Sequence, residues 1–234
     1  MVNAKEAALR RIYSTPGNPG SFGGIKPLWR QAKKEGLKVN KAQVKEFLQG
    51  QDAYTKHGRI IKAKKGVLNE RIITSGPFDL WEADLMDFPK ASPQGGRPVA
   101  GLPRYILTVI DVASKHAWTE ALQNKTPATM VKAFGAILER ALSEKVKLDN
   151  LRTDAGTEFF NRPMKALFKE KGINHYRAQK EPGAAVVERF NRTLGEKLAR
   201  YATDNPHIGQ RELVAVMPEM VAAYNKAEHS ATRQ

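Results

Sequence analysis

The fold is decided by one stretch of the sequence, Asn150-Leu151-Arg152-Thr153-Asp154-Ala155-Gly156-Thr157-Glu158-Phe159. Its apolar lead-in predicts a strand that ends just before Asp154, and Gly156 lets the backbone turn two residues later. An Asp ahead of a Gly after a strand is often only turn chemistry, so this stretch by itself does not establish a site. It does predict a carboxylate at the rim of a sheet, where the functional residues of such folds gather.

Two further acids join Asp154 when the sequence is followed in both directions. Downstream, an amphipathic helix carrying Glu188 is predicted to begin within Val186-Val187-Glu188-Arg189-Phe190-Asn191-Arg192-Thr193-Leu194. Upstream, a strand carrying Asp84 is predicted within Phe78-Asp79-Leu80-Trp81-Glu82-Ala83-Asp84-Leu85. We expect the three carboxylates to converge at one edge of the sheet.

These motifs resemble those of the DDE transposase and retroviral-type integrase superfamily. The resemblance rests on Trp81-x-x-Asp84, Thr153-Asp154-x-Gly156-x-Glu158-Phe159 and Glu188-Arg189-Phe190-Asn191-Arg192-Thr193-Leu194. It is greatest to the integrases of Polinton/Maverick elements, which carry a similar amino-terminal stretch. That stretch is here Tyr13-x-x-x-Pro16 with Ser21-Phe22-Gly23-Gly24, followed by Val44-Lys45-x-Phe47-Leu48-x-x-Gln51-x-Ala53-Tyr54-Thr55.

The resemblance implies that Asp84, Asp154 and Glu188 are both the catalytic residues and the metal ligands. Carboxylates are hard oxygen donors that suit Mg²⁺ or Mn²⁺. Two such ions, about 3.5–4 Å apart, can activate an attacking oxygen and stabilise the leaving oxygen of a phosphodiester. The implied reaction is 3′-end processing of element DNA, followed by strand transfer of the ends into target DNA. The acids that compete for these roles are Glu82, Asp87, Asp111 and Glu158.

The charge of the chain predicts a polyanionic partner. Lys and Arg number 39 against 24 Asp and Glu, which gives a formal net charge of +15 and an isoelectric point near 10.0. Nucleic acid is the first candidate, and the resemblance implies double-stranded DNA, as element ends and as target. A homo-oligomer on DNA, a dimer or tetramer, is implied by the resemblance, because two ends must be joined in concert.

The residue types also indicate which sites and locations are not expected. The chain has no cysteine and its five histidines are scattered, so we expect no zinc, whereas retroviral relatives generally carry a His/Cys zinc-binding domain. No run approaches the roughly 18 apolar residues of a membrane span, so no membrane association is expected. We expect nuclear localisation in a eukaryotic host and otherwise an intracellular protein, with packaging in a virus-like particle as a further option.

The expected fold class is α/β, with a small all-α domain in front. Residues 1–55 are predicted to form a helical, helix-turn-helix-like DNA-binding domain, residues 56–76 a basic linker, and residues 77–234 a ribonuclease-H-like catalytic core. Within the first part, helices are predicted over Ala4–Tyr13 and Pro27–Glu35, and a third helix begins after Asn40.

The core is predicted to be a mixed sheet with helices on its faces. Its strands are expected over Leu80–Phe88, Tyr105–Val112, Ala117–Leu122, Lys147–Thr153 and Ile173–Tyr176. Its helices are expected after Thr126, over Pro163–Lys171, over Ala184–Ala202, and over Leu213–Tyr224 with a kink or division at Pro218. The segment Gln179–Gly183 is expected to be a mobile loop.

DNA contacts are predicted for side chains of the third helix, of the linker and of the surroundings of Glu188. They are Lys41, Gln43, Lys45, Lys62, Lys64, Lys65, Lys180, Arg189, Arg192 and Lys197. The alternative is that these positions are ordinary solvated side chains or helical salt-bridge partners. For the whole chain, two alternatives stay open: a catalytically inactive DNA-binding or assembly protein derived from an integrase, and a purely hydrolytic ribonuclease-H-like nuclease.

Overall fold

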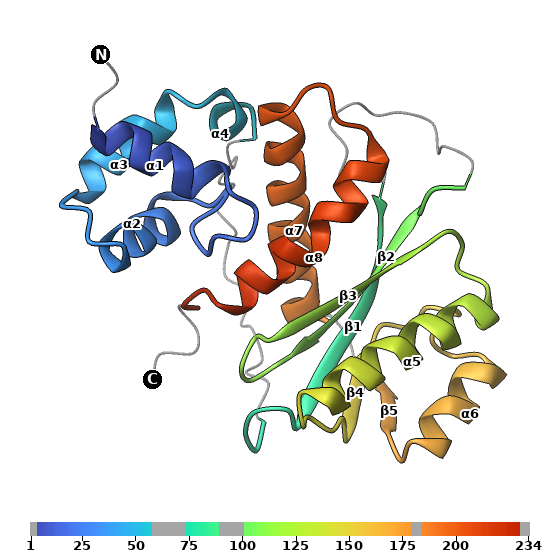
Figure 1. Cartoon of the computed structure of the whole chain (residues 1–234). Helices are drawn as coiled ribbons and strands as arrows, with labels where there is room; N and C mark the ends of the chain where they lie inside the picture. The colour runs from blue at the N-terminus through green and yellow to red at the C-terminus, as the bar shows by residue number, and fades with distance from the viewer. Residues whose placement is uncertain (1–3, 58–73, 89–100, 179–183, 230–234) are drawn as a thin grey trace, which may run out of the picture. The chain divides into compact units, whose positions relative to one another are not determined.

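The computed structural model describes residues 4–57, 74–88, 101–178 and 184–229. By their packing these residues fall into two compact units (Figure 1). The helical unit contains residues 4–57 and 193–229, and the sheet unit contains residues 74–88, 101–178 and 184–192. This division differs from the predicted boundaries, because the last part of the chain packs with the first. A separate DNA-binding role for residues 1–55 stays a prediction.

The sheet unit is built on five strands in the order β3-β2-β1-β4-β5. The strands are β1 (Leu80–Asp87), β2 (Tyr105–Asp111), β3 (Ala117–Leu122), β4 (Asn150–Thr153) and β5 (Asn174–Arg177). The first three form an antiparallel meander, whereas β4 pairs with β1, and β5 with β4, in parallel. The sheet is therefore mixed with β1 at its centre, which confirms the predicted ribonuclease-H-like fold.

Helices α5 (Pro127–Ser143) and α6 (Arg162–Glu170) lie together beside the sheet (Figure 1). Both begin with proline in the first turn and a polar N-cap. The sequence predicted this start for α5, whereas α6 begins at Arg162, one residue before its predicted start. The Asn161 side chain accepts the Met164 N–H at 3.0 Å, and Thr126 caps α5 in the same way. Capping of this kind satisfies backbone donors that a helix start leaves unpaired.

The core of the sheet unit fills the space between the sheet and these two helices. The Trp81 and Trp118 rings stack with their centroids 4.3 Å apart, and Phe134 meets Phe168 edge to face at 5.2 Å. Trp81, Ala83 and Leu85 of β1 all belong to or pack on this core. Successive side chains of a strand point to opposite faces, so Glu82 and Asp84 point to the other face of the sheet.

The helical unit contains four short helices, α8 and the second part of α7 (Ala185–Asp204). The other helices are α1 (Ala4–Ser14), α2 (Ile25–Lys34), α3 (Lys41–Gln49), α4 (Asp52–Lys56) and α8 (Gln210–Asn225). The sequence did not predict α4. Nor is α8 divided, since one helix continues through Pro218.

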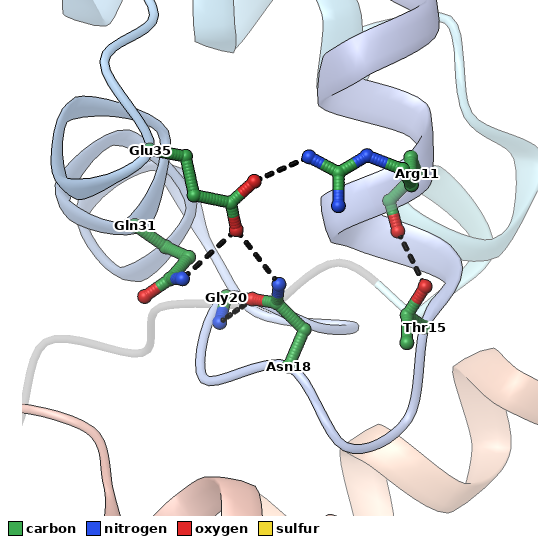
Figure 2. A network of polar contacts seen from close by, with 6 residues as sticks. All are labelled: Arg11, Thr15, Asn18, Gly20, Gln31 and Glu35. Carbon is green, nitrogen blue, oxygen red and sulfur yellow. Dashed lines mark hydrogen bonds and ion pairs between the residues drawn. The ribbon is translucent and has the colours of Figure 1, made fainter.

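A carboxylate at the end of α2 ties three segments of the helical unit together (Figure 2). Glu35 accepts hydrogen bonds from Arg11 of α1, from Asn18 at 3.0 Å and from Gln31 at 2.9 Å. Burial, the largest single influence, raises the pKa of Glu35, but these hydrogen bonds together outweigh it and hold the pKa below its ordinary value. Glu35 therefore stays ionised and fixes the loop between α1 and α2.

Within the described part of the chain, no helix is both long and apolar enough to cross a membrane.

Phe134 tests whether the core of the sheet unit depends on α5. Its side chain is fully buried, so we expect Phe134→Ala to lower the free energy of unfolding by about 3–5 kcal/mol through lost burial and a residual cavity. Leu142 on the same helix is 69% exposed and provides the control: Leu142→Ala should change stability by less than about 0.5 kcal/mol. Urea unfolding followed by circular dichroism measures both. Equal losses in the two variants would contradict the described packing of α5.

Candidate active site

Asp84 and Asp154 are brought together by the register of two parallel strands. The last paired residues of β1 and β4 are Ala83 and Thr153, and the two aspartates follow directly on their neighbouring strands. Asp84 is half-buried, whereas Asp154 is exposed beyond the end of β4. The charge of Asp154 raises the pKa of Asp84, which means that the two carboxylates lie within electrostatic reach of each other.

Glu188 reaches the same place from α7. It lies in the first turn of the helix, is exposed, and also raises the pKa of Asp84 by charge repulsion. Asp154 and Glu188 therefore both act electrostatically on Asp84.

The pKa of Asp84 is raised from 3.8 to about 6. Burial is the main cause, and repulsion by Asp154 and Glu188 adds to it. Two hydrogen bonds act in the opposite direction: the Leu85 N–H donates to Oδ1 and the Asn191 Nδ2 to Oδ2, each at 2.7 Å. A carboxylate with these surroundings is one that a cation would stabilise.

Asn191 is a site residue whose role the sequence analysis missed. It lies three residues after Glu188, so α7 presents an acid and an amide on neighbouring positions of one face. The amide holds Asp84 by the 2.7 Å bond. The available signal was the spacing within the motif that begins at Glu188.

The competing acid Glu82 is fully buried and already has partners. Its Oε2 accepts the N–H groups of Val186 and Val187 at 2.8 and 3.0 Å, and its Oε1 pairs with Arg152. Glu82 is thus bonded to the first turn of α7 and is not free to bind a ligand in this arrangement.

The other competing acids also have other surroundings. Asp111 is buried and accepts the N–H groups of Phe78 at 2.9 Å and Ser114 at 2.6 Å, so it stabilises loops at the end of β2. The Glu158 carboxylate lies against Gly156, where an added Cβ would come within 2.5 Å of the carboxyl carbon. Asp87 is the last residue of β1, paired with Tyr105. These hydrogen bonds give no reason to prefer Asp111 to Asp84 as the acid of the candidate site.

The carboxylates of Asp84, Asp154 and Glu188 are donors that suit a hard cation, but they are not arranged at metal-binding distances in this structure. Across residues 4–57, 74–88, 101–178 and 184–229, no three His, Cys, Asp or Glu side chains are spaced to hold a metal ion. Asp84 instead uses its two oxygens on Leu85 and Asn191. Asp154 and Glu188 nevertheless both raise the pKa of Asp84, and carboxylates close enough to repel one another are groups that divalent cations bind.

Part of the chain matches a known protein family. Residues 74–181 match the family model described as the integrase core domain. This stretch of the chain is therefore similar to the core domain of the DDE and retroviral-type integrases. Asp84 and Asp154 lie within the matched residues, and Glu188 lies just beyond them.

Two curated relatives of the integrase core come from mobile elements. An uncharacterised transposon-derived protein of Caenorhabditis elegans is 28% identical over 123 residues, which make up 53% of this chain and 41% of that protein. The retrovirus-related Pol polyprotein from transposon TNT 1-94 of Nicotiana tabacum is 35% identical over 100 residues, or 41% of this chain and 7% of the polyprotein. The chain thus spans less than half of each relative. A particular similarity to Polinton/Maverick integrases stays a prediction.

A solved structure shows the same fold. It is a simian T-cell lymphotropic virus intasome, determined by cryo-electron microscopy in complex with the PP2A regulatory subunit B56 gamma. The match has a TM-score of 0.51 and 16% sequence identity, and covers 87% of this chain and 66% of that one.

The predicted DNA contacts on α3 divide into different surroundings. Lys41, Gln43 and Lys45 are all exposed. The Gln43 side chain, however, accepts the Asn40 N–H at 3.0 Å in a capping box, and the Lys41 ammonium lies 4.7 Å from the Trp29 ring centroid. Gln43 is therefore used by its own helix.

The predicted DNA contacts near Glu188 differ in whether their side chains are exposed. Arg189 and Arg192 are exposed on α7, in the sheet unit with Glu188. Lys197 instead lies in the helical unit and is only 7% exposed. Its ammonium donates to the Ser21 carbonyl, and burial lowers its pKa to about 8. In this structure the Lys197 ammonium is therefore not accessible to a DNA phosphate, because it is buried and already bonded to the Ser21 carbonyl.

Four of the predicted DNA contacts, Lys62, Lys64, Lys65 and Lys180, lie outside the described residues, as does the predicted loop Gln179–Gly183.

Asp84 should make the stability of the metal-free protein depend on pH. Because its folded pKa is raised, its contribution to stability is fully present below about pH 4 and is lost as the pH rises through about 6. Asp84→Asn removes the buried charge, so at about pH 7 the variant should be more stable than the wild type by roughly 2–3 kcal/mol. The two should agree near pH 4.

Urea unfolding in EDTA, at several pH values, measures this difference. Asp149→Asn is the matched control, because Asp149 is 58% exposed and pairs with Lys147 away from the site. A wild type that is more stable than Asp84→Asn at every pH would contradict the described environment of Asp84.

Proposed function

We propose that this protein is a DNA integrase or transposase that processes the 3′ ends of element DNA and transfers them into target DNA. One observation carries the proposal: β1, the end of β4 and the first turn of α7 each provide one acid, and the charges of Asp154 and Glu188 both act on Asp84. Asp84, Asp154 and Glu188 are proposed as catalytic residues and as ligands of Mg²⁺ or Mn²⁺. The integrase core domain over residues 74–181 supports this reading.

The chain's own residues would hold and orient the reacting groups. When bound, two divalent ions would supply activation of the attacking oxygen and neutralisation of the charge on the phosphate. Asp84, Asp154 and Glu188 are the residues that would hold the ions through their carboxylate oxygens. The Asn191 side chain donates a hydrogen bond to the Asp84 carboxylate and would thereby keep that carboxylate oriented toward the ions.

DNA is the proposed partner because the chain carries a net charge of +15. Arg189 and Arg192, exposed on the same helix as Glu188, are proposed to contact phosphates near the reacting bond. Lys41 and Lys45 are proposed contacts on the helical unit. A homo-oligomer on two DNA ends is proposed, since the related simian virus integrase fold was solved in an intasome. Nuclear localisation is proposed for a eukaryotic host.

Strand transfer by the purified chain tests the proposal. A labelled duplex with the element's terminal sequence is incubated with a supercoiled plasmid and Mg²⁺ or Mn²⁺, and both joining and plasmid nicking are measured. We expect Asp154→Asn and Glu188→Gln to lose more than about 100-fold of joining, since loss of a ligand should exceed the 10–100-fold cost typical of outer-shell partners. DNA binding should be retained, because neither acid is expected to attract phosphate.

The control for this assay is Asp149→Asn, an acid-to-amide change next to the start of β4, which should keep full activity. Metal-dependent nicking without joining would favour the hydrolytic nuclease. Tight DNA binding without either reaction would favour an inactive assembly protein.

A further inference from the structure

The central strand β1 carries two acids on one face, and only one of them belongs to the proposed triad. Glu82 lies two residues before Asp84 and points to the same side of the sheet. Its side chain is 0% exposed. A fully buried carboxylate is costly unless its oxygens are well bonded, so its partners reveal what it does.

One oxygen of Glu82 holds the start of α7. Oε2 accepts the N–H groups of Val186 at 2.8 Å and Val187 at 3.0 Å. These N–H groups lie at the positive end of the helix dipole and have no partner within the helix. The next residue along the helix is Glu188, so this bond fixes the backbone immediately before the third acid.

The other oxygen of Glu82 holds β4. Oε1 pairs with the guanidinium of Arg152, and the same two residues are opposite each other in the parallel register of β1 and β4. Arg152 lies two residues before Asp154, as Glu82 lies two residues before Asp84. The Glu82–Arg152 ion pair therefore lies on β1 and β4 two residues before Asp84 and Asp154.

We propose that Glu82 is the positioning residue of the triad. Through a single buried carboxylate it links the three elements that carry Asp84, Asp154 and Glu188. It does not itself touch the reacting atoms, and it acts by setting the distance of the two outer acids from the central one. This inference rests on the proposed function, because it assigns Glu82 a role in arranging the proposed metal ligands.

The bonding explains why this position requires a carboxylate. Both oxygens accept hydrogen bonds, one from the helix start and one from Arg152. A glutamine has only one acceptor oxygen, so its amide N–H₂ must face a donor on one of the two sides. Removing Arg152 as well relieves that conflict, because the glutamine oxygen can then stay on α7.

The test therefore uses Glu82→Gln, Arg152→Met and the double variant Glu82→Gln/Arg152→Met. The control is Glu120→Gln, which breaks another Glu–Arg pair, that with Arg140 at 2.8 Å on the edge strand β3. This pair is partly exposed, whereas Glu82 is fully buried. The first measurement is amide hydrogen exchange at Val186 and Val187. The second is the Mn²⁺ concentration that broadens the NMR signals of Asp84, Asp154 and Glu188, which needs no catalysis. The third is kcat and KM for strand transfer.

For Glu82→Gln we expect exchange at Val186 and Val187 to accelerate, and the Mn²⁺ concentration for half-maximal broadening to rise about tenfold, the scale typical of outer-shell partners. We expect kcat to fall by about the same factor while KM for DNA is unchanged. The double variant should recover most of each loss. Glu120→Gln should match the wild type in all three measurements.

The outcomes separate this proposal from the proposed function. Wild-type protein that binds Mn²⁺ but does not join DNA would contradict the proposed integrase reaction. The positioning role of Glu82 would then be decided by the hydrogen-exchange and Mn²⁺ measurements alone. Glu82→Gln protein with unchanged exchange and unchanged Mn²⁺ dependence would overturn the positioning role. So would a double variant that recovers nothing, or a loss of activity that only follows the fraction of folded protein.

Discussion

The parallel pairing of β1 with β4 is the constraint on which the site depends. These strands are far apart in the sequence, and only their register makes Asp84 and Asp154 neighbours. The pairing needs the long connection through α5, because two parallel strands cannot be joined by a short turn. The core supports the register from one face, where Trp81 and Ala83 pack, and leaves the opposite face of β1 for the two acids.

The arrangement that brings the acids together also lowers the stability of the metal-free protein. Burial and two neighbouring acids raise the pKa of Asp84, so ionising it destabilises the metal-free fold. The surrounding hydrogen bonds from Leu85 and Asn191 offset part of that cost. Sites built for catalysis commonly keep such local cost, because the fold elsewhere is stable enough to tolerate it.

The local elements were readable from the sequence, because caps and periodicity act over a few residues. Thr126 with Pro127, and the apolar run of β2, define their elements without help from distant residues. The three acids were predicted through their motifs, and their role as catalytic residues and metal ligands stays a prediction. What could not be read were partners separated by long stretches of chain, such as Glu82 with the start of α7 or Lys197 with Ser21. The capping bond of the Gln43 side chain to the Asn40 N–H was not predicted either, and a DNA contact of Gln43 stays a prediction.

The stacked indoles give the protein an intrinsic optical reporter. The Trp81 and Trp118 rings lie 4.3 Å apart and are inclined by only 19°, so their electronic transitions should couple and give a paired band in near-ultraviolet circular dichroism. The remaining tryptophan, Trp29, belongs to the helical unit, where the ammonium groups of Lys33 and Lys41 lie within 5.0 Å of its ring centroid. Its emission responds to that separate environment. Near-ultraviolet circular dichroism can therefore follow the packing of the sheet unit without any added label.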